Sequence, residues 1–120
     1  METHVQMSGD FDQLDPGSRF EVQEDLLEYV DREKTRFRNV FLNAHLKRLH
    51  ASLGSKPLLQ CTLQLTTDVG RFNAVEEGFG GDAAIKSALL ALRYQVDKRL
   101  DVLAENRVKV EGRKALGAES

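Results

Sequence analysis

Apolar residues recur at three- and four-residue steps across residues 82–104, which is the spacing of one stripe along an α-helix. Asp82 suits the N-cap of this helix, because its carboxylate can accept hydrogen bonds from free backbone N–H groups. We therefore predict a long helix that buries its apolar side against a sheet. The stripe consists of Ile85, Leu89, Leu92, Val96, Leu100 and Leu103.

A second helical pattern runs from Ser18 to about Phe41. Ser18 and Glu21 have the spacing of a capping box at the start of a helix. The exposed side begins acidic and ends basic, an order that stabilises the helix dipole. The predicted helix over residues 18–41 carries the apolar stripe Val22, Leu26, Val30, Phe37, Val40 and Phe41.

Alternation with a period of two, typical of a half-buried strand, is clearest in residues 58–65, where leucines and Cys61 alternate with Gln and Thr. Three more strands are predicted at residues 4–9, 44–53 and 71–77. Turns are predicted at residues 55–57 and 68–70, and a flexible glycine-rich junction at residues 78–81. The order β-α-β-β-β-α predicts an α+β domain, and the simplest packing places both helices on one face of a four-stranded antiparallel sheet.

The 120 residues correspond to about one domain, predicted over residues 1–105. The pattern then decays into residues 106–120, predicted to be a basic, disordered C-terminal tail. No run approaches the ~18 apolar residues of a membrane span, and the start of the chain lacks the pattern of a signal peptide. Cys61 is the single cysteine, so an internal disulfide is excluded and a cytoplasmic location is expected.

The net charge of −2 is unevenly distributed. Residues 1–31 hold nine acids and one base, Arg19, whereas residues 32–120 hold ten acids and sixteen bases. A nucleic-acid partner remains compatible with an acidic protein, because affinity follows local basic patches. Charge runs are also common on ordinary solvated faces, so the asymmetry alone favours neither interpretation.

Candidate chemistry is sparse. The possible metal ligands His4, His45, His50 and Cys61 do not form a recognisable ligand motif. Cys61 alternates with leucines, which predicts a buried structural thiol instead of a nucleophile. The segment GFGGDAAIK lacks the Gly-Lys-Ser/Thr ending of a phosphate-binding loop. We expect no enzymatic activity, no metal, no cofactor, no small-molecule substrate and no membrane partner.

Basic residues on the two predicted helices are the strongest functional signal. If the helices lie side by side, these residues line one surface that binds phosphates with strong salt dependence. Folded RNA fits this surface better than sequence-read DNA, because no recognition-helix pair is evident. The predicted RNA-binding residues are Arg32, Arg36, Arg38, Lys86, Arg93, Lys98 and Arg99.

Several segments resemble the short ribosome hibernation-promoting factors, also called ribosome-associated inhibitors or sigma modulation proteins. The segment LLEYVDREKTRFRNVF (26–41) is similar to that family's Leu-x-x-Tyr-Val stretch and the alternating basic and apolar residues after it. The segments LQCTLQL (59–65) and RFNAVEEG (71–78) resemble its central hairpin. AIKSALLALRYQVDKRL (84–100) resembles its last helix, and the resemblance covers about residues 4–104.

The resemblance implies a fold related in shape to double-stranded-RNA-binding domains. It also implies binding to the small ribosomal subunit, in the channel for messenger and transfer RNA. Such factors block translation and preserve idle ribosomes during stress, using basic residues on both helices against ribosomal RNA and no cofactor. The dimerisation domain of the long forms has no counterpart here, so the resemblance implies a monomer that does not pair ribosomes.

Some positions match the family's pattern and others depart from it. Arg36 stands where the family has a lysine on its first helix, and Lys98 matches a basic position on its last helix. Arg93 and Arg99 offer charge from positions next to those used by the family. Positions that are commonly basic in the family hold Glu33, Ala91 and Tyr94 here.

The main alternative is a divergent member that acts as a protein-interaction or regulatory module without RNA binding, since the acidic first thirty-one residues suit a basic protein. A general double-stranded-RNA binder is a weaker alternative, because Asp82-Ala83-Ala84 occupies the place of that fold's usual Lys-Lys pair. A small enzyme is the weakest. RNA-driven binding weakens steeply as salt rises, whereas binding through an apolar protein interface does not.

Overall fold

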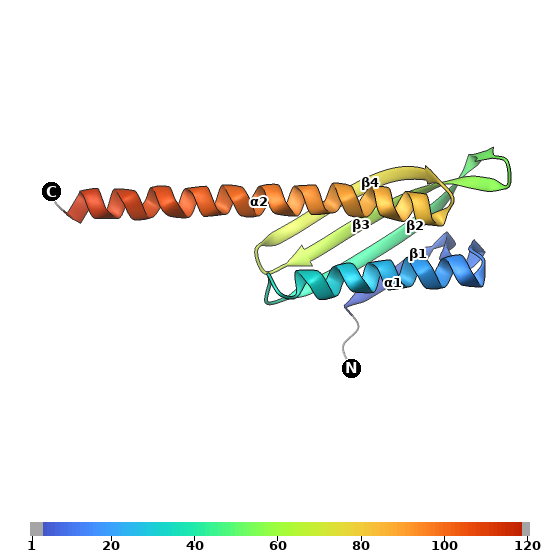
Figure 1. Ribbon diagram of the computed structural model, residues 1–120, viewed down its shortest axis with the longest axis horizontal. Coiled ribbons are helices and arrows are strands. Elements are labelled where there is room, and N and C mark those ends of the chain that lie inside the picture. The colour runs from blue at the N-terminus through green and yellow to red at the C-terminus, as the bar shows by residue number, and fades with distance from the viewer. Residues whose placement is uncertain (1–3, 119–120) are drawn as a thin grey trace.

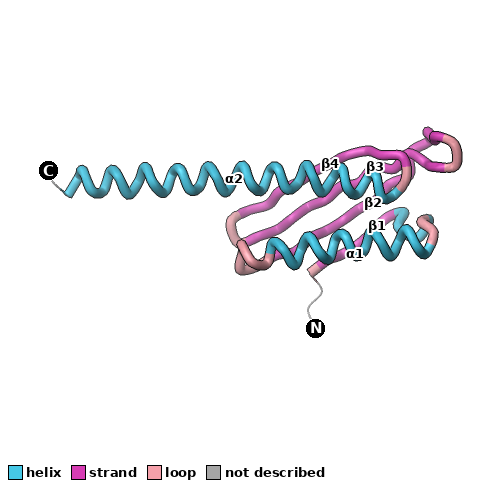
Figure 2. The backbone as a smooth tube through the Cα atoms, in the orientation of Figure 1, coloured by secondary structure: helices cyan, strands magenta, loops and turns pink. Residues whose placement is uncertain are grey.

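Two helices cover one face of a four-stranded sheet in the computed structural model, which describes residues 4–118 (Figure 1). The secondary structure along the chain is drawn in Figure 2. The elements are β1 (Val5–Gly9), a short 3-10 helix η1 (Asp10–Gln13), α1 (Pro16–Glu33), β2 (Val40–Leu53), β3 (Lys56–Thr67), β4 (Gly70–Phe79) and α2 (Gly81–Ala118). The predicted α+β class and the order of the main elements are confirmed.

The sheet has the order β1-β2-β3-β4, with antiparallel pairs β2–β3 and β3–β4. One correction concerns β1, which runs parallel to β2, with Val5 opposite Leu42. The sheet is therefore mixed and not wholly antiparallel as predicted. The cause is the intervening helix, because α1 carries the chain back to the starting end of the sheet, and two strands joined in this way run in the same direction.

Helix α1 is shorter than predicted and starts earlier. Its N-cap is Asp15, not Ser18: the Asp15 carboxylate accepts a hydrogen bond of 3.1 Å from the Ser18 backbone N–H. This hydrogen bond lowers the pKa of Asp15. The helix ends at Glu33, and Val40 and Phe41 belong to β2. Their helical spacing is overridden because they pair with threonines of β3, and β-branched and aromatic residues suit a sheet.

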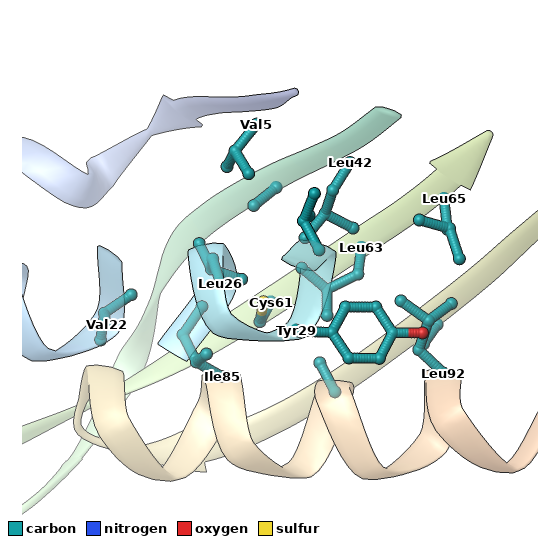
Figure 3. Packing of buried hydrophobic residues seen from close by; sticks show 14 of the residues in the cluster. Val5, Val22, Leu26, Tyr29, Leu42, Cys61, Leu63, Leu65, Ile85 and Leu92 are labelled. Atoms are coloured by element: carbon teal, nitrogen blue, oxygen red, sulfur yellow. The ribbon is translucent and has the colours of Figure 1, made fainter. Parts of the chain in front are cut away.

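The core lies between the sheet and the helices. Figure 3 shows Leu26 and Tyr29 of α1 over the sheet, with Ile85 and Leu92 of α2 beside them. All four side chains are buried, and complete burial of a leucine contributes about 2 kcal/mol relative to exposure. Cys61 is also buried, as predicted, and burial raises the pKa of its thiol to about 12. The sheet contributes Leu42, Ala44, Leu46, Leu59, Cys61, Leu63, Leu65, Phe72 and Ala74 to this core.

Gly78 sets how closely α2 approaches β4. A Cβ at this position would lie 2.6 Å from the Ala84 nitrogen and 2.8 Å from the Ala83 carbonyl carbon. Only a glycine leaves room for this contact between the strand and the first turn of the helix. Residues 78–81 therefore do not form the predicted flexible junction, because Gly78 lies within β4 and Gly81 begins α2.

Helix α2 has 38 residues and is about 57 Å long, so its C-terminal part extends past the sheet (Figure 1). The predicted disordered tail differs from the structure: the backbone is helical to Ala118, and the tail side chains lie outside what is described. Extending a helix that already exists fixes only one residue for each new hydrogen bond. Among the described helices, none is apolar over the length that a membrane crossing requires.

Candidate nucleic-acid interface

A groove lies between α1 and α2, which run side by side in the same direction over the sheet (Figure 1). The groove has a volume of about 350 Å³. Three of the predicted RNA-binding residues line it, Arg32 from α1 and Lys86 and Arg93 from α2. We call it the inter-helix groove. Its lining is completed by Asp25, Glu28, Tyr29, Leu89 and Leu90.

The inter-helix groove is acidic at one end and basic at the other. The Lys86 ammonium lies 3.1 Å from the Asp82 carboxylate, and this hydrogen-bonded ion pair raises the pKa of Lys86. Asp25 lies in the same groove, and its pKa is raised by burial and by the charge of Asp82. Arg32 and Arg93, further along the helices, form no ion pair among the described residues. The free positive charge of the groove is therefore at the C-terminal end of α1.

Arg36 lies in the loop after α1, not on the predicted helix, and two carboxylates hold it. One guanidinium nitrogen donates to Asp97 of α2 at 2.8 Å, and the other donates to both Glu33 oxygens at 2.9 and 3.1 Å. Glu33 is only 1% exposed. Burial alone would lower the pKa of Arg36, but the hydrogen bonds to Asp97 and Glu33 outweigh it and raise that pKa. Arg36 thus connects the two helices and is not a free cation.

The Tyr29 hydroxyl belongs to the same buried region. Its oxygen is buried and has no hydrogen-bond partner among the described residues. Burial, followed by the negative charge of Glu33, raises the pKa of Tyr29 well above its ordinary value. The phenol therefore stays neutral at any physiological pH.

Arg38 also lies outside the predicted helix, in the loop between α1 and β2. Its backbone N–H donates to the Asp68 carboxylate at 3.2 Å. This hydrogen bond fixes the loop against the turn between β3 and β4. The Arg38 side chain is exposed beside that turn.

A second hollow lies between α2 and the start of β4. It has a volume of about 490 Å³, and Lys98 and Arg99 line it from α2. Arg71 of β4 lies opposite them in the same hollow. The Lys98 ammonium lies 5.9 Å from the centroid of the exposed Tyr94 ring, within range of a cation–π contact.

These positions lie toward the end of the sheet where β3 turns into β4, in two places: the inter-helix groove on one side of α2 and the hollow between α2 and β4 on the other. The cations come from both helices, one loop and one strand. Lys86 is the predicted residue that lies away from this end, near the first turn of α2. We call the cluster the basic end and define it by Arg32, Arg36, Arg38, Arg71, Arg93, Lys98 and Arg99.

A comparison with known families decides the class of this domain. Residues 4–114 match the family described as hibernation factor Hib, C-terminal domain. The chain belongs to this family. No curated protein matches it. Membership assigns this hibernation-factor domain a ribosome-associated role in hibernation, and it confirms the family predicted from the sequence.

Sequence reasoning missed several cations of this hibernation-factor domain. Arg71 carries no signal in its own segment, because only the packing of α2 against β4 brings it to Lys98 and Arg99. Lys47 and Lys56 lie on the long β2–β3 hairpin. The sequence does contain a signal for them, because no acidic residue occurs between Glu33 and Asp68.

The site of the hibernation-factor domain offers cations and hydrogen-bond donors to a ligand. Among the residues described, no group of three or more His, Cys, Asp or Glu side chains is placed to hold a metal ion. Cys61, the one thiol, is buried beneath both helices. This arrangement fits the binding of phosphate groups.

Proposed function

We propose that this domain holds idle ribosomes by binding the RNA of the small subunit through its basic end. The observation that carries the proposal is the convergence of Lys98 and Arg99 from α2 with Arg71 from β4 in one hollow. Arg93 and Arg32 add positive charge in the inter-helix groove, on the other side of α2. Family membership supplies the ribosome as the partner, and the surface supplies contacts to its RNA backbone.

The proposed mechanism is steric and electrostatic. Each lysine or arginine that contacts a phosphate releases counterions, so binding strengthens as salt falls. Backbone contacts of this kind fix position and orientation without reading base sequence. The domain acts as a monomeric binding module in the cytoplasm. It needs no cofactor and performs no reaction, and its bulk on the small subunit excludes the ligands of an active ribosome.

The seven predicted residues do not contribute equally to this proposal. Lys86 is paired with Asp82, and Arg36 is held by Glu33 and Asp97. A cation that already pairs with a carboxylate contributes less to RNA affinity, because that ion pair must break before the cation can bind a phosphate. Affinity for RNA therefore depends mainly on Arg71 and on the five other predicted residues, which are Arg32, Arg38, Arg93, Lys98 and Arg99.

Co-sedimentation with separated ribosomal subunits, over a range of salt, tests the proposal. The basic-end variant combines Arg71→Gln, Lys98→Gln and Arg99→Gln. We expect at least a tenfold loss of affinity for the small subunit and a fall of about 2–3 in the slope of log affinity against log salt, about one per lost phosphate contact. Circular dichroism should show an unchanged fold, since the three side chains lie at the surface.

A matched control removes the same charge from cations that already have carboxylate partners. The paired-cation variant combines Arg19→Gln, Lys34→Gln and Lys86→Gln, whose partners are Asp12, Asp31 and Asp82. We expect its affinity to change less than about twofold. Equal losses in both variants would mean that only net charge matters, and unchanged binding in a folded basic-end variant would overturn the proposed surface.

One observation favours a second function, a protein-interaction module without RNA binding. The middle of α1 carries four acids, the exposed Glu21, Glu24 and Glu28 and the half-buried Asp25. This surface would suit a basic protein, including one within the ribosome. Under this alternative, ribosome binding would survive the basic-end variant and would be lost when these four acids are replaced by Gln or Asn.

A further inference from the structure

The β2–β3 hairpin projects past the ends of both helices, on the side of the molecule opposite the basic end (Figure 1). Two hydrogen bonds hold its base. The Arg48 backbone N–H donates to the Asp10 carboxylate at 2.7 Å, and the Gly80 N–H donates to the Pro57 carbonyl at 2.9 Å. β2 has a bulge between Arg48 and Ser52, so the hairpin from Arg48 to Leu53 is as long as its partner stretch from Leu59 to Lys56, about 10 Å at ~3.3 Å per residue. The hairpin is thus an anchored projection that contributes little to the core.

Three cations lie along this hairpin. Lys56 is near the tip, paired with Leu53, whereas Lys47 and Arg48 lie at the base, where β4 still pairs with β3. All three are exposed, and no carboxylate forms an ion pair with them among the described residues. The segment between Glu33 and Asp68 contains no acid at all. On a chain with a net charge of −2, such a segment repels no phosphate and attracts polyanions.

The two cations at the base lie on opposite faces of the hairpin. Arg48 pairs with Leu59, which is buried on the helix-covered side of the sheet, so Arg48 is on that side. Lys47 precedes it and therefore points to the opposite face. A ribbon charged on one face would lie flat on a surface, whereas one charged on both faces fits between two walls of phosphate.

The tip adds an apolar contact. Leu53 is 64% exposed, and Gly54 with φ +61° allows the tight turn that follows it. An exposed leucine on a narrow, charged ribbon resembles the apolar wedges that nucleic-acid-binding proteins place against bases.

We propose that the β2–β3 hairpin is a second RNA-binding element, which enters a cleft between two backbones of folded ribosomal RNA. This inference rests on the proposed function and deepens it, because the domain then contacts RNA at two separate places, the hairpin and the basic end. β2 has 14 residues, so the hairpin tip and the basic end lie about 40 Å apart. The acidic start of α1 lies between them along the helix layer. The partner must therefore present phosphates at two separated places, as a large folded RNA does.

The test uses the whole chain and a hairpin variant that combines Lys47→Gln, Arg48→Gln and Lys56→Gln. We expect about a tenfold weaker binding to the small subunit, a salt slope reduced by about 2–3, and an unchanged melting temperature. Hydroxyl-radical footprinting of the RNA should lose one protected patch and keep the patch that the basic-end variant loses. The control here combines Arg19→Gln and Lys34→Gln, two cations with carboxylate partners that are outside the predicted RNA-binding set.

The outcomes separate this inference from the proposed function. If the hairpin variant binds like the unmodified chain while the basic-end variant is weakened, the hairpin proposal is overturned and the proposed function stands. If only the hairpin variant is weakened, the hairpin is an RNA contact and the basic end is not. If the unmodified chain binds neither the small subunit nor purified ribosomal RNA, both proposals fail. If the hairpin variant binds the intact small subunit more weakly but binds purified ribosomal RNA as the unmodified chain does, a protein occupies the hairpin and the RNA proposal is overturned.

Discussion

Both ends of the sheet carry cations, but the two ends hold them in different ways. At the basic end Arg36 is tied to Glu33 and Asp97, so part of the positive charge holds the helices together. At the opposite end Lys47 and Lys56 are exposed on the β2–β3 hairpin and form no ion pair among the described residues. The difference shows that a count of basic residues does not measure a binding surface. Which cations are available depends on which carboxylates the fold places beside them.

One sheet separates the two ends, and the reactivity of Cys61 in the middle of β3 tests whether that sheet is rigid. Its pKa of about 12, against 9.0 for a free thiol, leaves about a thousandfold less thiolate below pH 9 in the folded protein. We expect alkylation at pH 8 to be slower by that factor than in denaturant. The pKa of the Cys61 thiol is higher in the folded protein than in the unfolded chain. The contribution of this thiol to the free energy of unfolding is therefore constant below pH 9 and falls as pH rises from 9 toward 12. Rapid alkylation of the native protein would show that the sheet opens between its ends.

Replacing Glu33 should show that the basic end has a structural role. Glu33→Gln removes the buried charge that accepts two hydrogen bonds from Arg36, and we expect a loss of about 2–3 kcal/mol in the free energy of unfolding. Urea denaturation measures this. The control is Asp31→Asn, which breaks an exposed ion pair with Lys34 and should cost at most about 0.5 kcal/mol. Equal costs would contradict a structural role for the Arg36 network.

Removing a carboxylate from Arg36 should make its guanidinium more available to RNA, as the unpaired lysines of the hairpin are. Asp97→Asn removes one of the two carboxylates on Arg36, and we expect RNA affinity to rise about two- to threefold because one guanidinium nitrogen loses its carboxylate partner while Glu33 holds the other. Fluorescence anisotropy with a fragment of ribosomal RNA measures the change. Asp101→Asn, one turn further along α2 at an exposed position, removes the same charge without freeing a cation. If both variants gain equally, Arg36 takes no part in binding.

The strands were predictable where burial alternates strictly. Leu59, Cys61, Leu63 and Leu65 face the helices, and their polar neighbours face away, so a period of two survives directly in the sequence. The long helix was equally clear, because Ile85, Leu92 and Val96 are all buried on one side of it. In such segments the local pattern agrees with the tertiary environment, so the sequence alone predicts the secondary structure.

The end of α1 was not predictable from spacing. Phe37, Val40 and Phe41 continue the helical stripe, and no Gly or Pro interrupts it. The helix stops because residues distant in sequence, Thr66 and Thr67 of β3, offer Phe41 and Val40 strand partners. This error placed Arg36 and Arg38 on a helix that they do not join. Their true neighbours, Asp97 and Asp68, are supplied by α2 and by the β3–β4 turn.

The parallel pairing of β1 with β2 also has a consequence for how the chain folds. Hairpin partners in β2, β3 and β4 are close in sequence, whereas Val5 must find Leu42 across the whole of α1. Closing a longer loop costs more conformational entropy, and distant pairings form more slowly. We expect the meander β2–β3–β4 with α2 to assemble first and β1 with α1 to dock last. The hairpin would then exist before the inter-helix groove, which becomes a binding surface only at the final step of folding.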